Sequence, residues 1–455
     1  MSQKHKIVIA GGGFAGLYAA LELEKTLAAR PDVEITLINK ENFFLFTPML
    51  HEIAAGDLDL TNIVNPVRKL LKKVAFFEGE VQEIDLERRR VVVGHGFDSH
   101  SHTLEFDQIV LSLGSTTQFF GLPGVQDHAL TMKSLSDAVK LRNRLIALLE
   151  AADTECSQTE RRELLSVAVA GAGFAGVETL ASINDFLRNS LRFYPNLSAS
   201  DLMLTVIHPG EVILPELSAK LGNYAQRKLE ERGIKVMAHT RVTSYDGSTI
   251  ELADGKQLSA RTLIWTAGTM PNPLISMLPC AIERGRVKVT AELAVADWPG
   301  VWAMGDCALV PDLRTGKFCP PTAQHALRQG TVVAQNILAY LDGGEFRRFD
   351  FKTIGQLATI GHRAGVASIF GVNVSGFLAW WMWRTIYLSK LPRLEKKIRV
   401  ALDWTLDLFF SKDLCQFIDV RQEHKMSNEG LRHLQEPPRR QDAASEQPLA
   451  ASATL

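Results

Sequence analysis

The chain has 455 residues, with 50 lysines and arginines against 51 aspartates and glutamates, and 46% of its residues are hydrophobic. This length predicts about three domains and a sizeable core, and the balanced charge excludes an extended nucleic-acid surface, which needs a basic excess. Five cysteines without regular spacing do not form a disulfide scaffold and are typical of a reducing compartment.

The first residues carry no export signal, because the apolar run over residues 7–10 is short and leads directly into glycines. No uninterrupted apolar run reaches about 18 residues, so we expect no ordinary transmembrane helix. If the protein meets a membrane, we expect it to lie on the surface.

A glycine-rich loop follows the first predicted strand. The order is a strand over residues 6–10, the loop Gly11-Gly12-Gly13-Phe14-Ala15-Gly16, a helix over 17–29 and a strand over 33–39. Together these elements predict a dinucleotide-binding βαβ unit. Gly11 permits the tight turn, Gly13 the approach of a pyrophosphate, and Gly16 close packing of helix on strand.

The end of the second strand is less regular. An acid that binds the ribose is expected about 20 residues past the glycines, but Asn39 and Lys40 stand there. Asn39 can still hydrogen-bond a hydroxyl. The alternative is that it only ends the strand.

The same pattern recurs in the second part of the chain. A strand over residues 165–170 precedes the loop Gly171-Ala172-Gly173-Phe174-Ala175-Gly176, and a returning strand covers 203–208. The hexapeptides GGGFAG and GAGFAG differ at one position, which indicates two copies of one architecture. His208 stands where an acid would hold the 2′-hydroxyl of NADH, so NADPH stays open as the second nucleotide.

Three later strands run into glycine, at Gly114, Gly268 and the pair Gly305-Asp306. Glycine at a strand end allows a ligand to approach the backbone closely. The simplest arrangement is an α/β fold with two Rossmann-like domains, the second inserted in the first. Two such domains indicate hydride transfer between a nicotinamide and a flavin. Asp306 can accept a bond from a ribityl hydroxyl, cap a helix, or do both.

Toward the end of the chain, residues 376–391 combine three tryptophans and a tyrosine with Arg384, a composition that suits a membrane interface. After Pro392 a second helix is expected, with Leu394, Ile398 and Leu402 on one side and charged residues opposite. Residues 390–399 contain five cations and only one acid. This local basic excess favours a monotopic membrane anchor. The alternative is a pair of helices for dimerisation or domain packing.

The motifs together resemble those of type II NADH:quinone oxidoreductases, the single-subunit, non-pumping, FAD-containing respiratory dehydrogenases. The segments that carry the resemblance, over about residues 5–420, are GGGFAGL, 42–56, 111–125, GAGFAGVE, LIWTAG, VWAMGDCA and 321–330. The resemblance implies FAD on the first loop with Asn39, Gly114 and Asp306, nicotinamide nucleotide on the second loop with Glu178, and Gln324 near a quinone. This chain departs from the family at three positions. Asn39 and His208 stand where the family commonly has an acid, and Arg328 stands where it commonly has a second glutamine.

Glu178 comes two residues after Gly176. The helix dipole there favours the ionised carboxylate, whereas burial against flavin and nicotinamide would favour the proton. Such a carboxyl can relay protons to a quinone. The alternative is a glutamate that only stabilises the helix dipole.

Cysteine placement separates this chain from disulfide reductases, because no C-x-x-C pair is present. A sulfide:quinone oxidoreductase using Cys156 and Cys319, a soluble NAD(P)H-dependent flavin reductase and a redox sensor remain alternatives. His95, His100 and His102 lack a standard ligand set, so we expect a polar hairpin loop at residues 94–102 and no metal site.

We therefore predict a peripheral enzyme on the cytoplasmic face of a membrane, which uses FAD and NADH to reduce a quinone; a homodimer is left open. The expected divisions are a FAD-binding domain in two parts at 1–155 and 291–345, an NAD(P)H-binding domain at 156–290, a membrane-associating or dimerisation region at 346–425 and a disordered tail at 426–455.

Overall fold

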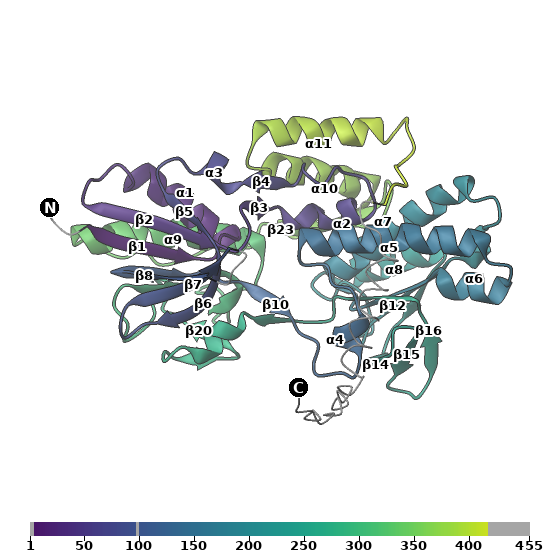
Figure 1. The fold of residues 1–455 in the computed structure, drawn as a ribbon, viewed down its shortest axis with the longest axis horizontal. Coiled ribbons are helices and arrows are strands. Elements are labelled where there is room, and N and C mark those ends of the chain that lie inside the picture. The colour runs from purple at the N-terminus through teal and green to yellow at the C-terminus, as the bar shows by residue number, and fades with distance from the viewer. Residues whose placement is uncertain (1–3, 97–99, 417–455) are drawn as a thin grey trace, which may run out of the picture.

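The computed structural model describes residues 4–96 and 100–416. The half of the molecule that contains the N-terminus, called here the first half, is built on a five-stranded parallel sheet. Its strands, in spatial order, are β21 (Val301–Ala303), β9 (Gln108–Leu111), β1 (His5–Ala10), β2 (Val33–Asn39) and β5 (Ala75–Glu78). Helices α1 (Phe14–Thr26) and α9 (Ala323–Asp342) pack against each other beside it (Figure 1). Gly330 makes this packing close, since a Cβ there would lie 2.5 Å from the Ala15 carbonyl oxygen.

A second, four-stranded parallel sheet repeats the plan. Its strands, in spatial order, are β13 (Ile234–Met237), β12 (Met203–Ile207), β11 (Ser166–Ala170) and β17 (Thr262–Trp265). The helices of this half are α5 (Leu135–Thr154), α6 (Gln158–Leu164), α7 (Phe174–Ser190) and α8 (Ala219–Glu231).

The two sheets are joined by an antiparallel ribbon, because β10 (Ser115–Thr117) leaves the first half and β18 (Thr269–Pro271) returns to it. Figure 1 shows β10 crossing between the halves. The chain then adds β21 beside β9 in the first sheet. This topology confirms the predicted insertion of the second domain in the first.

Smaller elements complete both halves. They are β3 (Phe43–Leu45), β4 (Val64–Pro66), β6 (Glu80–Asp85), β7 (Arg90–His95), β8 (His100–Glu105), β14 (Val242–Tyr245), β15 (Thr249–Leu252), β16 (Gln257–Ser259), β19 (Ile282–Glu283), β20 (Arg286–Lys288), β22 (Ala308–Leu309), α2 (Leu50–Ala54), α3 (Val67–Leu70) and α4 (Val125–His128).

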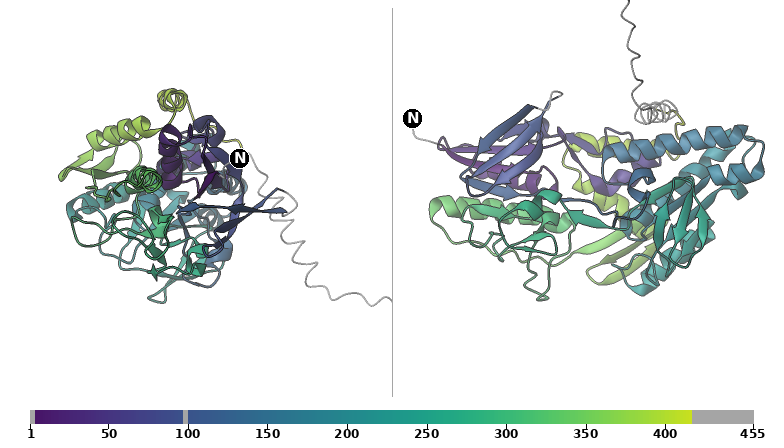
Figure 2. Two further views of the ribbon diagram at one scale, coloured as in Figure 1. Left: turned by 90° about the vertical axis from the view of Figure 1, so that its left-hand side faces the viewer. Right: turned by 60° about the horizontal axis from the view of Figure 1, so that its bottom comes forward.

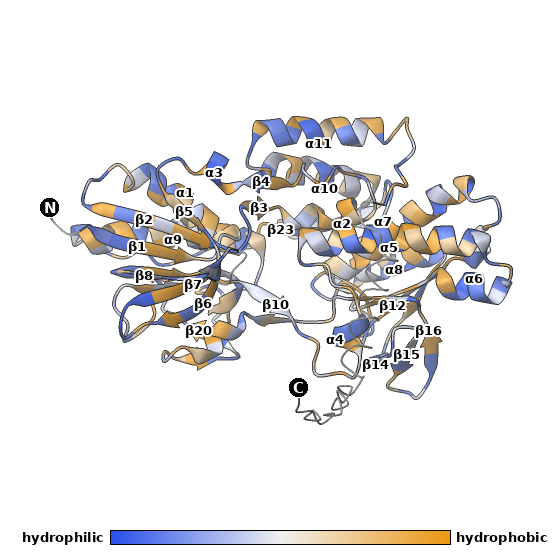
Figure 3. Ribbon diagram, viewed as in Figure 1, coloured by the Kyte–Doolittle hydropathy of each residue, from blue (hydrophilic) through white to orange (hydrophobic). Residues whose placement is uncertain are grey.

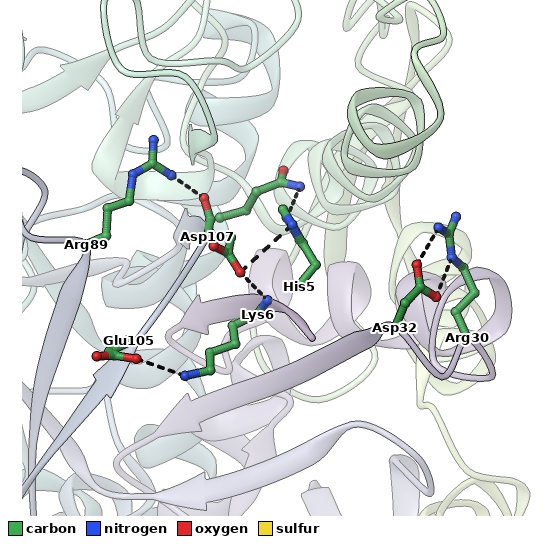
Figure 4. Close-up of polar contacts among 8 residues, drawn as sticks. His5, Lys6, Arg30, Asp32, Arg89, Glu105 and Asp107 are labelled. Atoms are coloured by element: carbon green, nitrogen blue, oxygen red, sulfur yellow. Dashed lines mark hydrogen bonds and ion pairs between the residues drawn. The ribbon is translucent and has the colours of Figure 1, made fainter. Parts of the chain in front are cut away.

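The first strand is fastened to the chain near β8 and β9 by side chains (Figure 4). Asp107 accepts a hydrogen bond from the Lys6 backbone N–H at 2.7 Å, and the Lys6 ammonium reaches Glu105 at 3.0 Å. Arg89 donates to the Asp107 carbonyl oxygen. These contacts fix the end of β1 opposite to the glycine loop.

The histidine-rich segment is more ordered than a loop, because β7 and β8 extend through His95 and His100 to either side of residues 97–99, which lie outside the described residues. The rings of His95 and His102 each lie 5.5 Å from the Phe77 ring. Packing of these rings on Phe77 explains the longer strands.

The C-terminal region adds a three-stranded antiparallel sheet and two helices. Its elements are β23 (Gly355–Thr359), β24 (Gly365–Ile369), β25 (Val372–Gly376), α10 (Phe377–Lys390) and α11 (Leu394–Leu406). Figure 1 places α11 outside α10, and the left view of Figure 2 shows it end-on at the edge of the molecule. None of the described helices is long and apolar enough to cross a membrane. The predicted disordered tail, residues 426–455, lies outside the described residues.

Candidate active site at two glycine loops

The first glycine loop is closed so tightly that only glycine fits at two positions. Gly11 has φ +103°, and a Cβ there would lie 2.4 Å from the Ser112 carbonyl oxygen. A Cβ on Gly16 would lie 1.8 Å from the Gly11 carbonyl oxygen. The Ser112 hydroxyl lies within 2.9 Å of the carbonyl oxygens of both Ala10 and Gly11 and supports the turn.

The second loop has the same construction. Gly171 has φ +104°, and a Cβ on Gly176 would lie 1.9 Å from the Gly171 carbonyl oxygen. The Thr266 hydroxyl lies 2.9 Å from the carbonyl oxygens of both Ala170 and Gly171. Ser112 and Thr266 were not predicted as loop-supporting residues, although each directly follows the neighbouring strand, as Ser112 follows β9 and Thr266 follows β17.

Both loops leave the start of a helix available to an anion. Gly13 and Gly173 are the N-caps of α1 and α7; neither helix has a side-chain cap or an acid in its first turn. The first N–H groups of a helix have no partner within it, so they can bind a pyrophosphate. A Cβ on Gly13 would meet nothing within 4 Å, which leaves room beside the first loop. These residues fit the phosphates of two dinucleotides.

The two strand ends differ in how their polar side chains are used. Asn39 accepts a hydrogen bond from the Gly12 N–H at 2.8 Å and donates to the Glu41 carbonyl oxygen at 2.7 Å, so it holds the loop in place. Lys40 forms an exposed ion pair with Glu80. His208 is only 8% exposed. Burial lowers the pKa of His208, which keeps the ring neutral.

A short polar chain lies where the two halves meet. The Ser115 hydroxyl donates to Asp306 at 2.7 Å, and the Lys133 ammonium donates to Ser115 at 3.1 Å. Burial lowers the pKa of Lys133, although Asp306 acts in the opposite direction. Gly114 precedes this chain with φ +68°. The sequence reasoning singled out Gly114 and Asp306 but not Lys133 or Ser115.

Gly268 directly precedes β18 in the same ribbon. Its carbonyl oxygen accepts from the Gln118 N–H, and a Cβ would lie 2.7 Å from the Phe120 ring. Phe120 itself has φ +55° and is 58% exposed.

Glu178 is buried where α7, α2, β23 and α10 meet. Its Oε1 accepts hydrogen bonds from the Trp383 indole N–H at 2.9 Å and the Thr359 N–H at 3.1 Å. Its Oε2 lies 4.0 Å from His51 Nδ1. Burial raises the pKa of Glu178 to about 8, and the two hydrogen bonds oppose this rise. The carboxyl therefore holds a proton at neutral pH.

His51 faces Glu178 as a neutral ring. Burial lowers its pKa to about 3, and its ring centroid lies 5.4 Å from that of Trp383. His51 Nε2 is 3.4 Å from the Thr359 hydroxyl. An uncharged His51 does not hold Glu178 in its ionised form. His51 lies in a segment that carries the family resemblance, and Trp383 lies in the tryptophan-rich segment 376–391. Their contact with Glu178 could not be predicted from the sequence.

Gln324 is bound to the strand that also contacts Glu178. Its amide donates to the Gly355 carbonyl oxygen at 3.1 Å and accepts from the Ile354 N–H at 3.2 Å. Arg328 donates to the Gln324 carbonyl oxygen and lies over the Phe351 ring. Gly355 and Thr359 are the two ends of β23, about 13 Å apart in an extended strand. Glu178 and Gln324 thus contact opposite ends of the same strand, β23.

The fold and the paired loops define an α/β flavoprotein with two dinucleotide-binding domains. A family model described as pyridine nucleotide-disulphide oxidoreductase matches residues 5–330, and one described as NDH2 C-terminal domain matches residues 354–413. A type II NADH:quinone oxidoreductase of Mycobacterium tuberculosis is 30% identical over 89% of this chain and 88% of its own length. One of Staphylococcus aureus is 30% identical over 84% and 94%. The chain belongs to the type II NADH:quinone oxidoreductase family.

Solved structures show the same fold. NDH2 from Plasmodium falciparum in complex with NADH has a TM-score of 0.85 at 21% identity, covering 91% of this chain and 100% of that one. The sulfide:quinone oxidoreductase of Aquifex aeolicus matches with a TM-score of 0.65 at 15% identity, over 90% and 96%. Both likenesses show the fold and cover similar shares of this chain. The sulfide-oxidising alternative is not favoured, because the similar curated relatives are type II NADH:quinone oxidoreductases.

Proposed function

We propose that this protein oxidises NADH and reduces a membrane quinone, with FAD as its bound cofactor. The observation that carries this proposal is the pair of equivalent loops, each closed by glycines and each presenting uncapped helix N–H groups. Bound FAD supplies the redox chemistry, because it accepts a hydride from NADH and passes two electrons to a quinone. Family membership supports the same reaction.

The residues of this chain would bind, orient and protonate. The N–H groups at the start of α1 and α7 would hold the pyrophosphates of FAD and NADH. Asp306, oriented by Ser115, would accept a hydrogen bond from a ribityl hydroxyl of FAD. Glu178 would supply a proton to the quinone, since its carboxyl is protonated near neutral pH and buried away from bulk water. Gln324 would position the segment at Ile354 and Gly355 that borders the quinone.

An anaerobic titration tests the reaction. NADH should bleach the flavin absorbance of the purified protein, and a menaquinone, ubiquinone or plastoquinone analogue should restore it. A second titration with NADPH measures the nucleotide preference that His208 leaves open. Persistent bleaching in the presence of every quinone would refute the proposed acceptor.

The outer face of α10 and α11 supports docking on a lipid surface. Along α11, Leu394, Ile398 and Leu402 are 71%, 54% and 55% exposed, whereas Lys396 and Trp404 are buried. Figure 3 shows apolar and polar residues alternating along this outer helix. Further exposed apolar residues of the same region are Phe377, Leu378, Trp381, Leu406, Leu408, Phe409 and Phe410. An exposed apolar face beside cations is what a monotopic anchor requires.

The polar side of α11 has a different role from the one expected. Lys396 was counted among the five cations that favour a membrane anchor, but its ammonium donates to the Thr61 carbonyl oxygen at 2.6 Å and the residue is buried. Asp403 accepts from the Asp59 N–H and the Asn62 amide. The polar side therefore binds the helix to the body. The remaining cations, together with the free thiols, favour the cytoplasmic leaflet.

Substitutions test this surface better than truncation, because removing the helices would expose Glu178 and His51. Ile398→Glu with Leu402→Glu should weaken binding to vesicles containing anionic lipid by about 30-fold or more, since each apolar side chain contributes ~1.5–3 kcal/mol when buried. The control, Met203→Glu with Met277→Glu, adds the same charge at exposed apolar sites elsewhere. Unchanged pelleting with loss of a dimer in ultracentrifugation would assign the face to dimerisation instead.

A further inference from the structure

A polar cavity of about 460 Å³ lies between α2, α7, α10 and the segment that follows α11. Its inner wall includes the buried residues His51, Glu52 and Thr359, and its outer wall includes the exposed residues Asn189, Arg192 and His362. The cavity therefore extends from solvent to the interior. It has room for several water molecules, and its lining offers them polar partners.

Two residues of the inner wall contact Glu178. Thr359 donates its N–H to Glu178, and His51 lies 4.0 Å from the same carboxyl. Glu178 itself does not line the cavity. Because Thr359 and His51 both line the cavity and contact Glu178, a proton entering the cavity comes within one residue of the Glu178 carboxyl.

Glu52 is the acidic group at the inner end of the cavity. It follows His51 in α2, and its Oε2 accepts a hydrogen bond from the Trp404 indole N–H at 3.2 Å. Arg384 lies over both the Trp380 and Trp404 rings, at 4.3 and 4.6 Å. Arg384 thus packs against Trp404, the residue whose indole N–H is hydrogen-bonded to Glu52.

The charges around Glu52 come from every neighbouring segment. Burial raises its pKa, and Asp57 adds to the rise, whereas Arg384, the Trp404 hydrogen bond and Lys412 oppose it. Lys412 is ion-paired with Asp57, and Asp407 also lines the cavity. Glu178, on α7, is influenced by the charge of Glu52 in turn. Glu52 can therefore exist in both protonation states near neutral pH.

The proposed reaction needs one proton from solvent in each turnover. NADH gives a hydride, which carries two electrons and one proton, and a quinone takes two electrons and two protons to become a quinol. The second proton must come from water, so that NADH, quinone and one proton give NAD⁺ and quinol. Because Glu178 is buried, its proton has to be replaced after each transfer.

We propose that Glu52 and the cavity beside it form the route by which protons from solvent reach Glu178. Each transfer moves one proton and no electrons. Glu178 gives its proton to a quinone oxygen, Glu52 gives its proton to Glu178 by way of the cavity, and Glu52 then takes a new proton from solvent. The inference rests on the proposed quinone reduction.

The test uses the FAD-loaded, full-length protein and separates the two half-reactions by stopped flow. Glu52→Gln has the shape of the protonated acid and keeps an acceptor for Trp404, but it cannot exchange a proton. Bleaching by NADH should be unchanged. Reoxidation by a short-chain ubiquinone analogue should slow by about 10- to 100-fold, up to the lower end of what a positioned proton-transfer group contributes, and should show a larger effect of D2O.

A matched variant separates proton transfer from structure. Trp404→Phe removes the hydrogen bond that Glu52→Gln keeps, but leaves the Glu52 carboxyl able to exchange a proton, so its reoxidation should remain fast. Equal slowing in both variants would assign Glu52 a structural role and overturn the inference. Wild-type reoxidation in Glu52→Gln would overturn it as well.

Infrared titration of the wild-type protein gives a second measurement that does not depend on the variants. Two buried carboxylic acids should lose their protons as pH rises above neutral, and absence of the second one would also overturn the proposal. A wild-type protein that bleaches with NADH and is never reoxidised by quinone would refute the proposed function itself. If the wild-type protein turns over normally and Glu52→Gln is reoxidised at the wild-type rate, this inference is refuted but the proposed function is not.

Discussion

The two glycine loops share their internal contacts, but the helices that follow them are covered by different partners. Ser112 supports the first turn as Thr266 supports the second. Five residues into the helix, counting from Phe14 and Phe174, stand Tyr18 and Glu178. Helix α1 packs on α9, where Gly330 allows close approach, whereas the start of α7 is covered by α2, β23 and α10. The scaffold is duplicated, and the chemistry at its equivalent position is not.

The largest effect is expected from valine at the last glycine of either loop. Gly16→Val and Gly176→Val each place a Cβ within 2 Å of a backbone oxygen, so the loop must open. Gly16→Val should be isolated without FAD. Gly176→Val should keep its FAD but fail to bleach with NADH. Absorbance after gel filtration and an NADH titration measure both.

Gly13→Ala is the control for that pair. Its Cβ would meet nothing within 4 Å of the chain, so the fold should persist while the FAD pyrophosphate is crowded. Loss of FAD from Gly176→Val as complete as from Gly16→Val would show that the two loops do not act as separate sites.

The next effect compares the equivalent positions. Glu178→Gln keeps acceptors for Trp383 and Thr359 but cannot release a proton, so reoxidation of the reduced flavin by quinone should slow by about 100-fold. Tyr18→Phe should reoxidise at the wild-type rate, because nothing in α1 requires its hydroxyl. Stopped-flow absorbance after reduction with one equivalent of NADH gives the rates. Slowing in Tyr18→Phe, or none in Glu178→Gln, would contradict the assigned role.

The repeated scaffold could be predicted from the sequence because glycine spacing and strand patterns are local. β2 was predicted with its observed bounds, and α1 begins three residues earlier than expected because Gly13 is its N-cap. The predicted insertion followed from the order of strands along the chain. That the two loops would bind FAD and NADH could be predicted for the same reason.

The surroundings of Glu178 could not be predicted, because they depend on contacts between segments far apart in sequence. Trp383 is 205 residues from Glu178, and Thr359 is 181 away. Composition indicated that α10 suits an interface but not that two of its three tryptophans, Trp380 and Trp383, are buried. Similarly, the helical wheel separated the two sides of α11 without showing that Lys396 would be buried against Thr61.

The smallest effect is on the pH dependence of stability, and its sign follows from the pKa of Glu178. The unfolded carboxyl ionises near pH 4.5, whereas the folded one keeps its proton up to about pH 8. Between these values the folded protein binds one more proton, so this group's contribution to stability falls by ~1.4 kcal/mol per pH unit. Glu178→Gln lacks this contribution. The wild-type melting temperature should therefore fall relative to that of Glu178→Gln by a few degrees from pH 6 to pH 8.

The difference between variants matters more than either curve, because other groups also titrate. Glu52 is electrostatically linked to Glu178, so removing the Glu178 proton site also changes when Glu52 ionises. Tyr18→Phe should run parallel to the wild type throughout, since burial raises the pKa of Tyr18 above its ordinary value, outside this range. Melting curves at one scan rate, with FAD content checked at each pH, measure the three slopes. Parallel curves for wild type and Glu178→Gln would mean that Glu178 is ionised in the folded protein, and it could not then be the proton donor.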